Sequence, residues 1–136
     1  MELKKKFKKI GFIFGLKREM KLVSQKNNNI ICVHGYGKAS KNAAKELIKF
    51  GVDIVINFGF AGSISKSLKN GDIVFVDNLF NEKKEKLSTL KLDEDFLRNL
   101  ENGFKFFKSN LLTVNKIVAD KEEKLNLAKK FKSISV

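Results

Sequence analysis

A glutamate at the end of a short motif is the first candidate for chemistry. Glu19 closes the segment Gly-Leu-Lys-Arg-Glu, which directly follows the apolar run of residues 10–14. A carboxylate just past a strand, at the mouth of a pocket, can act as a general base toward water. An acid in the first turn of a helix would explain Glu19 equally well, and the spacing alone favours this second interpretation.

A glycine pair forms the second candidate. Gly35 and Gly37 stand in the segment His-Gly-Tyr-Gly-Lys-Ala-Ser, between a predicted strand and a predicted helix. Glycines at such a junction let an anion or a ribose approach the helix N-terminus. The segment is most of a dinucleotide-binding fingerprint, but Ser40 replaces the third small residue, and Asp53 matches the expected downstream acid poorly. The plainer interpretation is a pair of glycines that only permits a tight turn.

The third candidate is the segment Gly59-Phe60-Ala61-Gly62, which follows the apolar run of residues 54–58. A second apolar run begins nearby with Gly71-Asp72-Ile73-Val74. A buried strand that ends in a glycine-rich loop places backbone amides where open α/β sheets bind their ligands. A tight turn out of the strand is the alternative, so the loop alone does not define a site.

The remaining reactive residue types indicate neither a metal site nor a cofactor. His34 and Cys32 are the single histidine and the single cysteine of the chain, so a metal ligand set is not expected and no disulfide can form within the chain. Cys32 lies inside an apolar run, which is typical of a small buried hydrophobe rather than of a nucleophile. His34 is expected to be a packed or surface residue.

The composition predicts a folded, cytoplasmic protein. The 136 residues are 43% hydrophobic and 32% charged, and no apolar stretch is long enough to span a membrane. The basic start lacks a small-residue cleavage site and is read as the approach to a first strand. The net charge of +13 raises the question of a nucleic-acid partner, but the lysines are scattered and only Arg18 and Arg98 are arginines. Nucleic-acid binding is therefore not expected.

Strands that alternate with helices predict an α/β sandwich with a largely parallel sheet. The segment Asn81–Leu92 is expected to be a charged, mobile connection, and Ser133–Val136 reads as the start of a strand at which the chain stops, which indicates a fold cut off before its end. Glu123 is expected to complete a capping box with Asp120. The expected strands are Lys9–Phe14, Ile30–His34, Ile54–Phe58, Asp72–Asp77 and Leu111–Val118, and the expected helices are Ala39–Phe50, Asp93–Phe107 and Lys121–Phe131.

Taken in order, the motifs Gly-Leu-x-x-Glu, Gly-x-Gly-Lys, Asn-x-Gly-x-Ala-Gly and Gly-Asp-Ile-Val resemble the nucleoside phosphorylase/nucleosidase superfamily over nearly the whole chain. The resemblance is greater to methylthioadenosine/adenosylhomocysteine-type nucleosidases, near the phosphorylase-like proteins linked to hopanoid synthesis. It implies that residues 1–136 form one domain, the N-terminal two-thirds of a three-layer α/β sandwich around a central, largely parallel mixed sheet. It also implies cleavage of a purine nucleoside's N-glycosidic bond, and a homo-oligomer.

The resemblance also implies roles for single residues. Glu19 falls on the carboxylate that activates water, and the loop Phe60, Ala61 and Gly62 falls on residues that contact the nucleoside. Gly35 and Gly37 would let the substrate approach, and Ile117 and Val118 fall near a strand end that touches the base. Asn57 stands where hexameric phosphorylases have a phosphate-binding arginine, which favours water over phosphate as the nucleophile.

One departure limits the expected activity. The family's Met-Glu pair that holds the ribose, and the acid that protonates the leaving purine, lie beyond the segment that matches Ser133–Val136. The resemblance therefore predicts that the chain by itself is inactive or incomplete. A phosphate-dependent phosphorylase and a non-catalytic nucleotide- or dinucleotide-binding module built on Gly35 and Gly37 stay open as alternatives.

Overall fold

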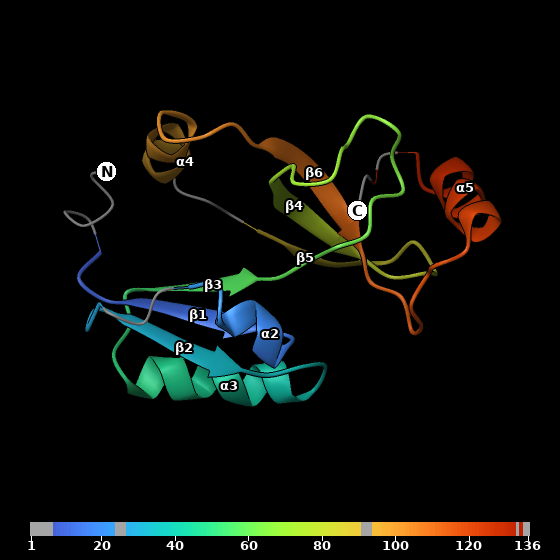
Figure 1. The fold of residues 1–136 in the computed structure, drawn as a ribbon. Helices are drawn as coiled ribbons and strands as arrows, with labels where there is room; N and C mark the ends of the chain where they lie inside the picture. Colours follow the sequence, from blue (N-terminus) through green and yellow to red (C-terminus); the bar gives the residue numbers. More distant parts are fainter. Residues whose placement is uncertain (1–6, 24–26, 91–93, 133, 135–136) are drawn as a thin grey trace. The chain divides into compact units, whose positions relative to one another are not determined.

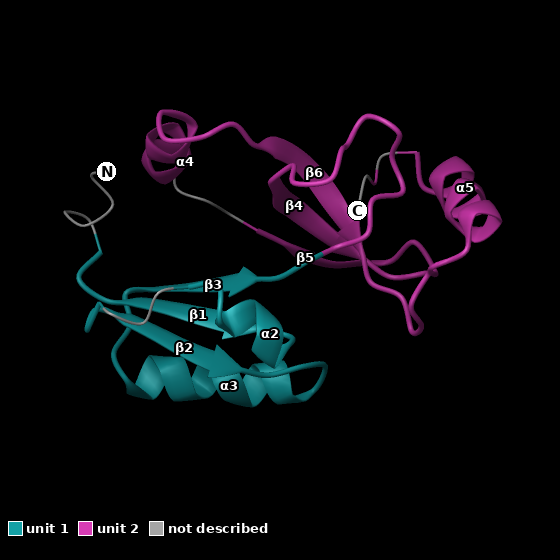
Figure 2. Ribbon diagram, viewed as in Figure 1, with its two compact units in different colours: residues 1–60 teal, residues 61–136 magenta. Residues whose placement is uncertain are grey.

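The computed structural model describes residues 7–23, 27–90, 94–132 and 134. The chain divides into two compact units, residues 1–60 and residues 61–136 (Figure 2). Strands and helices alternate in the first unit, whereas two consecutive strands open the second unit before its first helix (Figure 1). The α/β class predicted from the sequence is confirmed, with one parallel sheet and one mixed sheet of three strands each.

The first unit is built on a parallel sheet in the order β2-β1-β3. Its strands are β1 (Ile10–Phe14), β2 (Ile30–His34) and β3 (Ile54–Phe58), and they match the predicted strands closely. The central strand, β1, pairs in register with both neighbours, so that Phe14 lies opposite His34 on one side and opposite Phe58 on the other. All three strands therefore end at the same edge of the sheet.

Helix α3 (Ala39–Lys49) lies along one face of this sheet (Figure 1). Leu47 is fully buried and forms the core of the unit together with Ile13 and Ala43. A Cβ built on Gly11 would lie only 2.9 Å from the Leu47 methyl carbons, so the glycine in β1 makes room for this side chain. The helix ends before Gly51, whose φ of 68° is the left-handed conformation expected of a glycine stop.

The second unit contains a mixed sheet in the order β5-β4-β6. Strand β4 (Val74–Phe80) pairs antiparallel with β5 (Lys86–Thr89) and parallel with β6 (Phe107–Leu112). Helix α5 (Lys121–Lys130) follows β6 after a loop. The buried side chains of Leu112, Phe131 and Ile134 form the core beside α5. Ile134 also makes a parallel bridge to Asn110, whereas Ser133, Ser135 and Val136 lie outside the described residues.

Several boundaries in the second unit differ from the prediction. Helix α4 (Glu94–Glu101) ends well before Phe107, because the chain turns at Gly103 and the Phe107 N–H then donates to the Ile73 carbonyl oxygen as β6 begins. The spacing of the phenylalanines fits a helix, but aromatic residues are equally at home in a strand. The predicted strand Leu111–Val118 is therefore wrong in all but its first two residues.

Two further expectations in this unit are corrected. The segment Asn81–Leu92 is not a plain connection, since β5 lies within it. The capping box at α5 is only half present among the described contacts: the Asp120 carboxylate accepts the Glu123 N–H at 2.8 Å, while the Glu123 carboxylate lies 2.9 Å from Lys116 Nζ.

Candidate functional site

Glu19 lies on the short helix α2 (Lys17–Met20), directly after the carboxyl end of β1. Glu19 is only 3% exposed. Charged residues are almost never buried without partners, so its carboxylate is expected to have them. Two backbone amides supply the partners: Leu16 N–H donates to Oε2 at 2.8 Å and Phe60 N–H donates to Oε1 at 3.0 Å. Glu19 therefore caps the start of α2, as the plainer interpretation expected, and also connects α2 to the chain that leaves β3.

The two hydrogen bonds leave part of the carboxylate free to act. An ionised carboxylate has about four lone-pair positions, and these two contacts occupy one on each oxygen. The remaining positions can accept a proton from a water molecule or from a sugar hydroxyl. Because the amides of Leu16 and Phe60 fix both oxygens, the direction of those positions is set by the backbone rather than by a flexible side chain.

Glycines surround the carboxylate. A Cβ built on Gly59 would lie 3.2 Å from Oε1 and 3.3 Å from Oε2 of Glu19. A Cβ built on Gly15 would lie 3.7 Å from Oε2 and also 3.7 Å from Cδ2 of Tyr36. Gly59 belongs to the third candidate segment, although no role was predicted for it alone, and Gly15 and Tyr36 were not predicted as site residues from the sequence. The glycine that opens each motif was a visible signal, but nothing in the sequence showed that both face the same carboxylate.

Two exposed aromatic residues belong to the segments that meet around this carboxylate. Tyr36 is 75% exposed and Phe60 is 67% exposed, whereas Phe14 at the end of β1 is fully buried. The Phe14 ring packs edge-on against Phe58, with ring centroids 6.0 Å apart. The ends of β1 and β3 thus carry two phenylalanine rings in contact, of which Phe14 is buried and Phe58 is 40% exposed.

Of the predicted substrate-binding glycines, Gly35 has a clear packing role. A Cβ at this position would come within 2.8 Å of the Ala39 carbonyl oxygen and 2.9 Å of the Ala43 side chain, so the glycine allows α3 to start close to the end of β2. Gly37 has a φ of 57° and no heavy atom within 4 Å of a Cβ built on it, which fits a turn residue. His34, at the end of β2, is exposed.

The other predicted site residues belong to the second unit. Ala61 and Gly62 continue the chain directly from Phe60 and are exposed. Ile117 is 93% exposed and Val118 is half-buried; both lie in the loop between β6 and α5 rather than at the end of a strand, where the sequence had placed them. Asn57 lies on β3 and is exposed. Glu19, Phe60 and the first glycine of the loop are thus the residues that the structure brings together.

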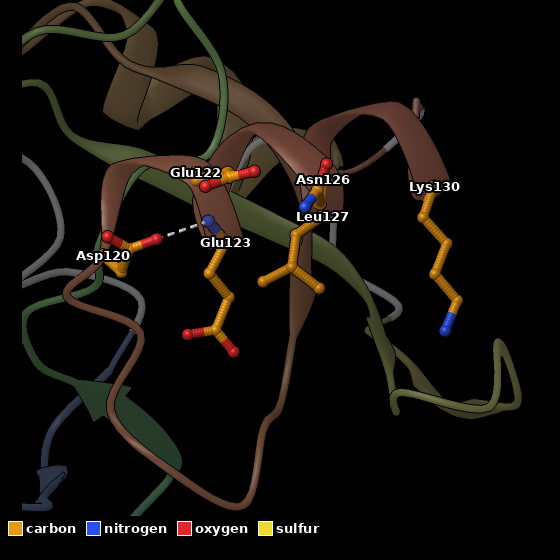
Figure 3. Close-up of a pocket in the computed structure, with 6 residues that line it drawn as sticks. All are labelled: Asp120, Glu122, Glu123, Asn126, Leu127 and Lys130. Carbon is orange, nitrogen blue, oxygen red and sulfur yellow. Dashed lines mark hydrogen bonds between the residues drawn. The ribbon is translucent and has the colours of Figure 1, made fainter.

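Two hollows described in the structure lie elsewhere, in the second unit. One, of about 340 Å³, lies against α5 and is lined by side chains of both charges (Figure 3). Asp120 points its carboxylate at the Glu123 N–H there, as a helix cap does. A second, of about 590 Å³, lies between α4 and the mixed sheet and includes Asp77 and Arg98. Neither hollow contains a residue of the predicted site.

Cys32 is the free thiol of the chain, on β2, and burial raises its pKa above the ordinary value. A raised pKa leaves less thiolate at neutral pH, and the thiolate is the reactive form. We expect Cys32 to react with a thiol reagent more slowly than free cysteine at pH 7, and the difference to disappear in urea. The rate of colour development with a disulfide reagent is measured for the folded chain, for the chain in urea and for free cysteine. An equal or faster rate in the folded chain would mean that the half-buried position on β2 does not protect the Cys32 thiol.

Over residues 7–23, 27–90, 94–132 and 134, no helix is long and apolar enough to cross a membrane. The same residues contain no group of three or more His, Cys, Asp or Glu side chains that could together hold a metal ion.

Solved structures of nucleosidases share this fold. The native futalosine hydrolase of Helicobacter pylori strain 26695 matches with a TM-score of 0.69 and 20% identity, over 94% of this chain and 73% of that one. The 5'-methylthioadenosine/S-adenosyl homocysteine nucleosidase of Campylobacter jejuni matches with a TM-score of 0.67 and 17% identity, over 93% of this chain and 73% of that one. The S-adenosylhomocysteine nucleosidase of Streptococcus pyogenes matches with a TM-score of 0.66 and 19% identity, over 94% and 72%. At these identities the matches show the fold alone.

No curated protein matches the sequence. The family model described as the phosphorylase superfamily matches residues 5–132, nearly the whole chain. The family inferred from the order of the four motifs is thereby confirmed, and the chain belongs to the phosphorylase superfamily.

Proposed function

We propose that this fold serves the hydrolysis of purine nucleosides at the N-glycosidic bond, with Glu19 as the base that receives a proton from water. The observation that carries the proposal is the buried carboxylate of Glu19, fixed by the amides of Leu16 and Phe60 at the start of the predicted nucleoside loop. A base must be oriented, which the two amides achieve, and the lone-pair positions that their hydrogen bonds do not use would accept the proton.

The reaction breaks one bond and forms another. The bond between the sugar C1′ and the purine nitrogen breaks as an oxocarbenium-like sugar forms, and the water oxygen then bonds to C1′. Glu19 takes the proton that this water loses, and the leaving purine takes a proton from another donor. The loop of Phe60, Ala61 and Gly62 would contact the nucleoside, with Gly35, Gly37, Ile117 and Val118 as further contacts implied by the resemblance.

Water is proposed as the nucleophile because the chain lacks an evident phosphate clamp on β3. Asn57 stands there, and an amide cannot replace the charged, bidentate contact that a guanidinium makes with a phosphate dianion. A phosphorolytic reaction is the second candidate, since the superfamily takes its description from phosphorylases. The two reactions differ in a single requirement, which is phosphate.

The proposal is tested by purine release from 5'-methylthioadenosine, S-adenosylhomocysteine and futalosine, with and without phosphate. The assay uses this chain and also the chain joined to the part of H. pylori futalosine hydrolase that the match does not cover. That part supplies the segments to which the resemblance assigns ribose binding and purine protonation. We expect the joined protein to release purine without phosphate. Release only with phosphate would favour phosphorolysis, and no release from any nucleoside would contradict the proposal.

A further inference from the structure

Gly59, the residue that follows β3, approaches the Glu19 carboxylate more closely than an ordinary side chain could. A Cβ built on it would lie 3.2 Å from Oε1, 3.3 Å from Oε2 and 3.4 Å from Cδ of Glu19. Contacts this short are tighter than nine in ten real Cβ contacts, so the carboxylate would have to move by a few tenths of an ångström. The position of the Glu19 carboxylate thus leaves too little room for a side chain at residue 59.

The backbone at this position does not itself require glycine. Gly37, Gly51 and Gly71 have positive φ values, whereas Gly59 does not. Gly62, in the same loop, differs in another way, because a Cβ built on it would meet no heavy atom within 4 Å. Alanine would therefore be free of backbone strain at residue 59. The three heavy atoms nearest to its methyl group all belong to the Glu19 carboxylate.

The carboxylate has little freedom to give way. Leu16 N–H holds Oε2 at 2.8 Å and Phe60 N–H holds Oε1 at 3.0 Å, and the side chain is almost fully buried. A methyl group at residue 59 would push both oxygens away, so at least one of the two hydrogen bonds would lengthen. The N–H groups of Leu16 and Phe60 donate in part-buried hydrogen bonds, so a lengthened bond would leave one of these donors poorly satisfied.

We infer that Gly59 is a positioning residue for Glu19: its missing side chain leaves the space in which the two amides orient the carboxylate. The catalytic consequence of this inference rests on the proposed function, but the geometric part does not. Reaction rates are sensitive to such positions, since a misplacement of about 1 Å can cost on the order of a hundredfold. A shift of a few tenths of an ångström should therefore lower the rate about tenfold, while the KM for the nucleoside stays within about twofold.

The geometric part is tested on the chain itself by nuclear magnetic resonance. In Gly59→Ala, we expect the amide proton signals of Leu16 and Phe60 to move upfield, as they do when a hydrogen bond lengthens. The matched control is Gly103→Ala, because a Cβ there would meet the Leu100 carbonyl oxygen at an ordinary 3.5 Å and Gly103 has no positive φ. The control should leave both amide signals in place. Unchanged amide signals in Gly59→Ala would overturn the inference.

The catalytic part is tested in the joined protein by combining two substitutions. If Gly59 acts through the carboxylate, Gly59→Ala should lower the rate of purine release about tenfold in the parent but change it little in a Glu19→Gln background. Equal losses in both backgrounds would overturn the positioning role while leaving the proposed function intact. Amide shifts together with no purine release by the parent would instead support the positioning of Glu19 and contradict the proposed function.

Discussion

Glu19→Gln is expected to lower the rate of purine release by on the order of a hundredfold or more, which is the usual contribution of a general base. Glutamine has nearly the same size as glutamate but cannot accept a proton from water at neutral pH. The rate is measured in the joined protein as purine released per enzyme at saturating nucleoside without phosphate. Full activity in the glutamine variant would remove Glu19 from the mechanism.

The same substitution should also weaken the fold, and the assay must allow for this. Both oxygens of Glu19 accept a backbone N–H, whereas an amide offers one oxygen and one NH₂ group. One of the two amides loses its acceptor, which should cost about 1–3 kcal/mol of unfolding free energy. Rates are therefore compared at a temperature at which circular dichroism shows the variant to be folded. Glu46→Gln, on the exposed side of α3, makes the same chemical change away from the site and should leave the rate unchanged.

Leu47→Ala is expected to lower the unfolding free energy by about 2–5 kcal/mol, the range measured for large-to-small changes in a core. Leu47 is fully buried between α3 and the parallel sheet, and Gly11 leaves room for its methyl groups. Alanine would leave a cavity that neither element can close. The midpoint of urea unfolding, followed by circular dichroism, measures the loss.

Ile48→Ala is the matched control, because Ile48 is the next residue of α3 and is 67% exposed. Its substitution should change the unfolding free energy by less than about 0.5 kcal/mol. A similar loss for both variants would mean that α3 does not pack as described.

The first unit could be predicted well because its local signals agree. Its strands are short apolar runs, as expected where a sheet is covered, and Gly51 marks the end of α3 in the left-handed conformation that glycine favours. Hydrophobic periodicity, turn chemistry and element length all pointed to the same boundaries.

The elements of the second unit were harder to predict from the sequence because its strands are less apolar. Strand β6 contains Ser109 and Asn110, and the Asn110 amide oxygen accepts a hydrogen bond from Asn78 on β4, so the polarity is satisfied across the sheet. That pairing depends on residues 32 positions apart in the chain, which no local pattern records. Strand β5 was not predicted because all four of its residues are exposed, so it shows no buried apolar pattern.

The candidate site was only partly visible in the sequence. The motif placed Glu19 at a strand end, but its second hydrogen bond comes from Phe60, 41 residues later. The requirement for glycine at residue 59 depends on this contact across the sheet edge, so it could not be read from the loop alone. Spacing can identify residue types that could do chemistry, whereas only the fold shows which groups share one carboxylate.

The identity of the sugar product tests the central claim most directly. The joined protein is incubated with 5'-methylthioadenosine in phosphate buffer, and the sugar product is identified from its mass by mass spectrometry. If Glu19 activates water and β3 offers no phosphate clamp, the product is the free methylthio-sugar even when phosphate is abundant. A methylthio-sugar 1-phosphate would contradict the account, because phosphate and not water would then have attacked C1′.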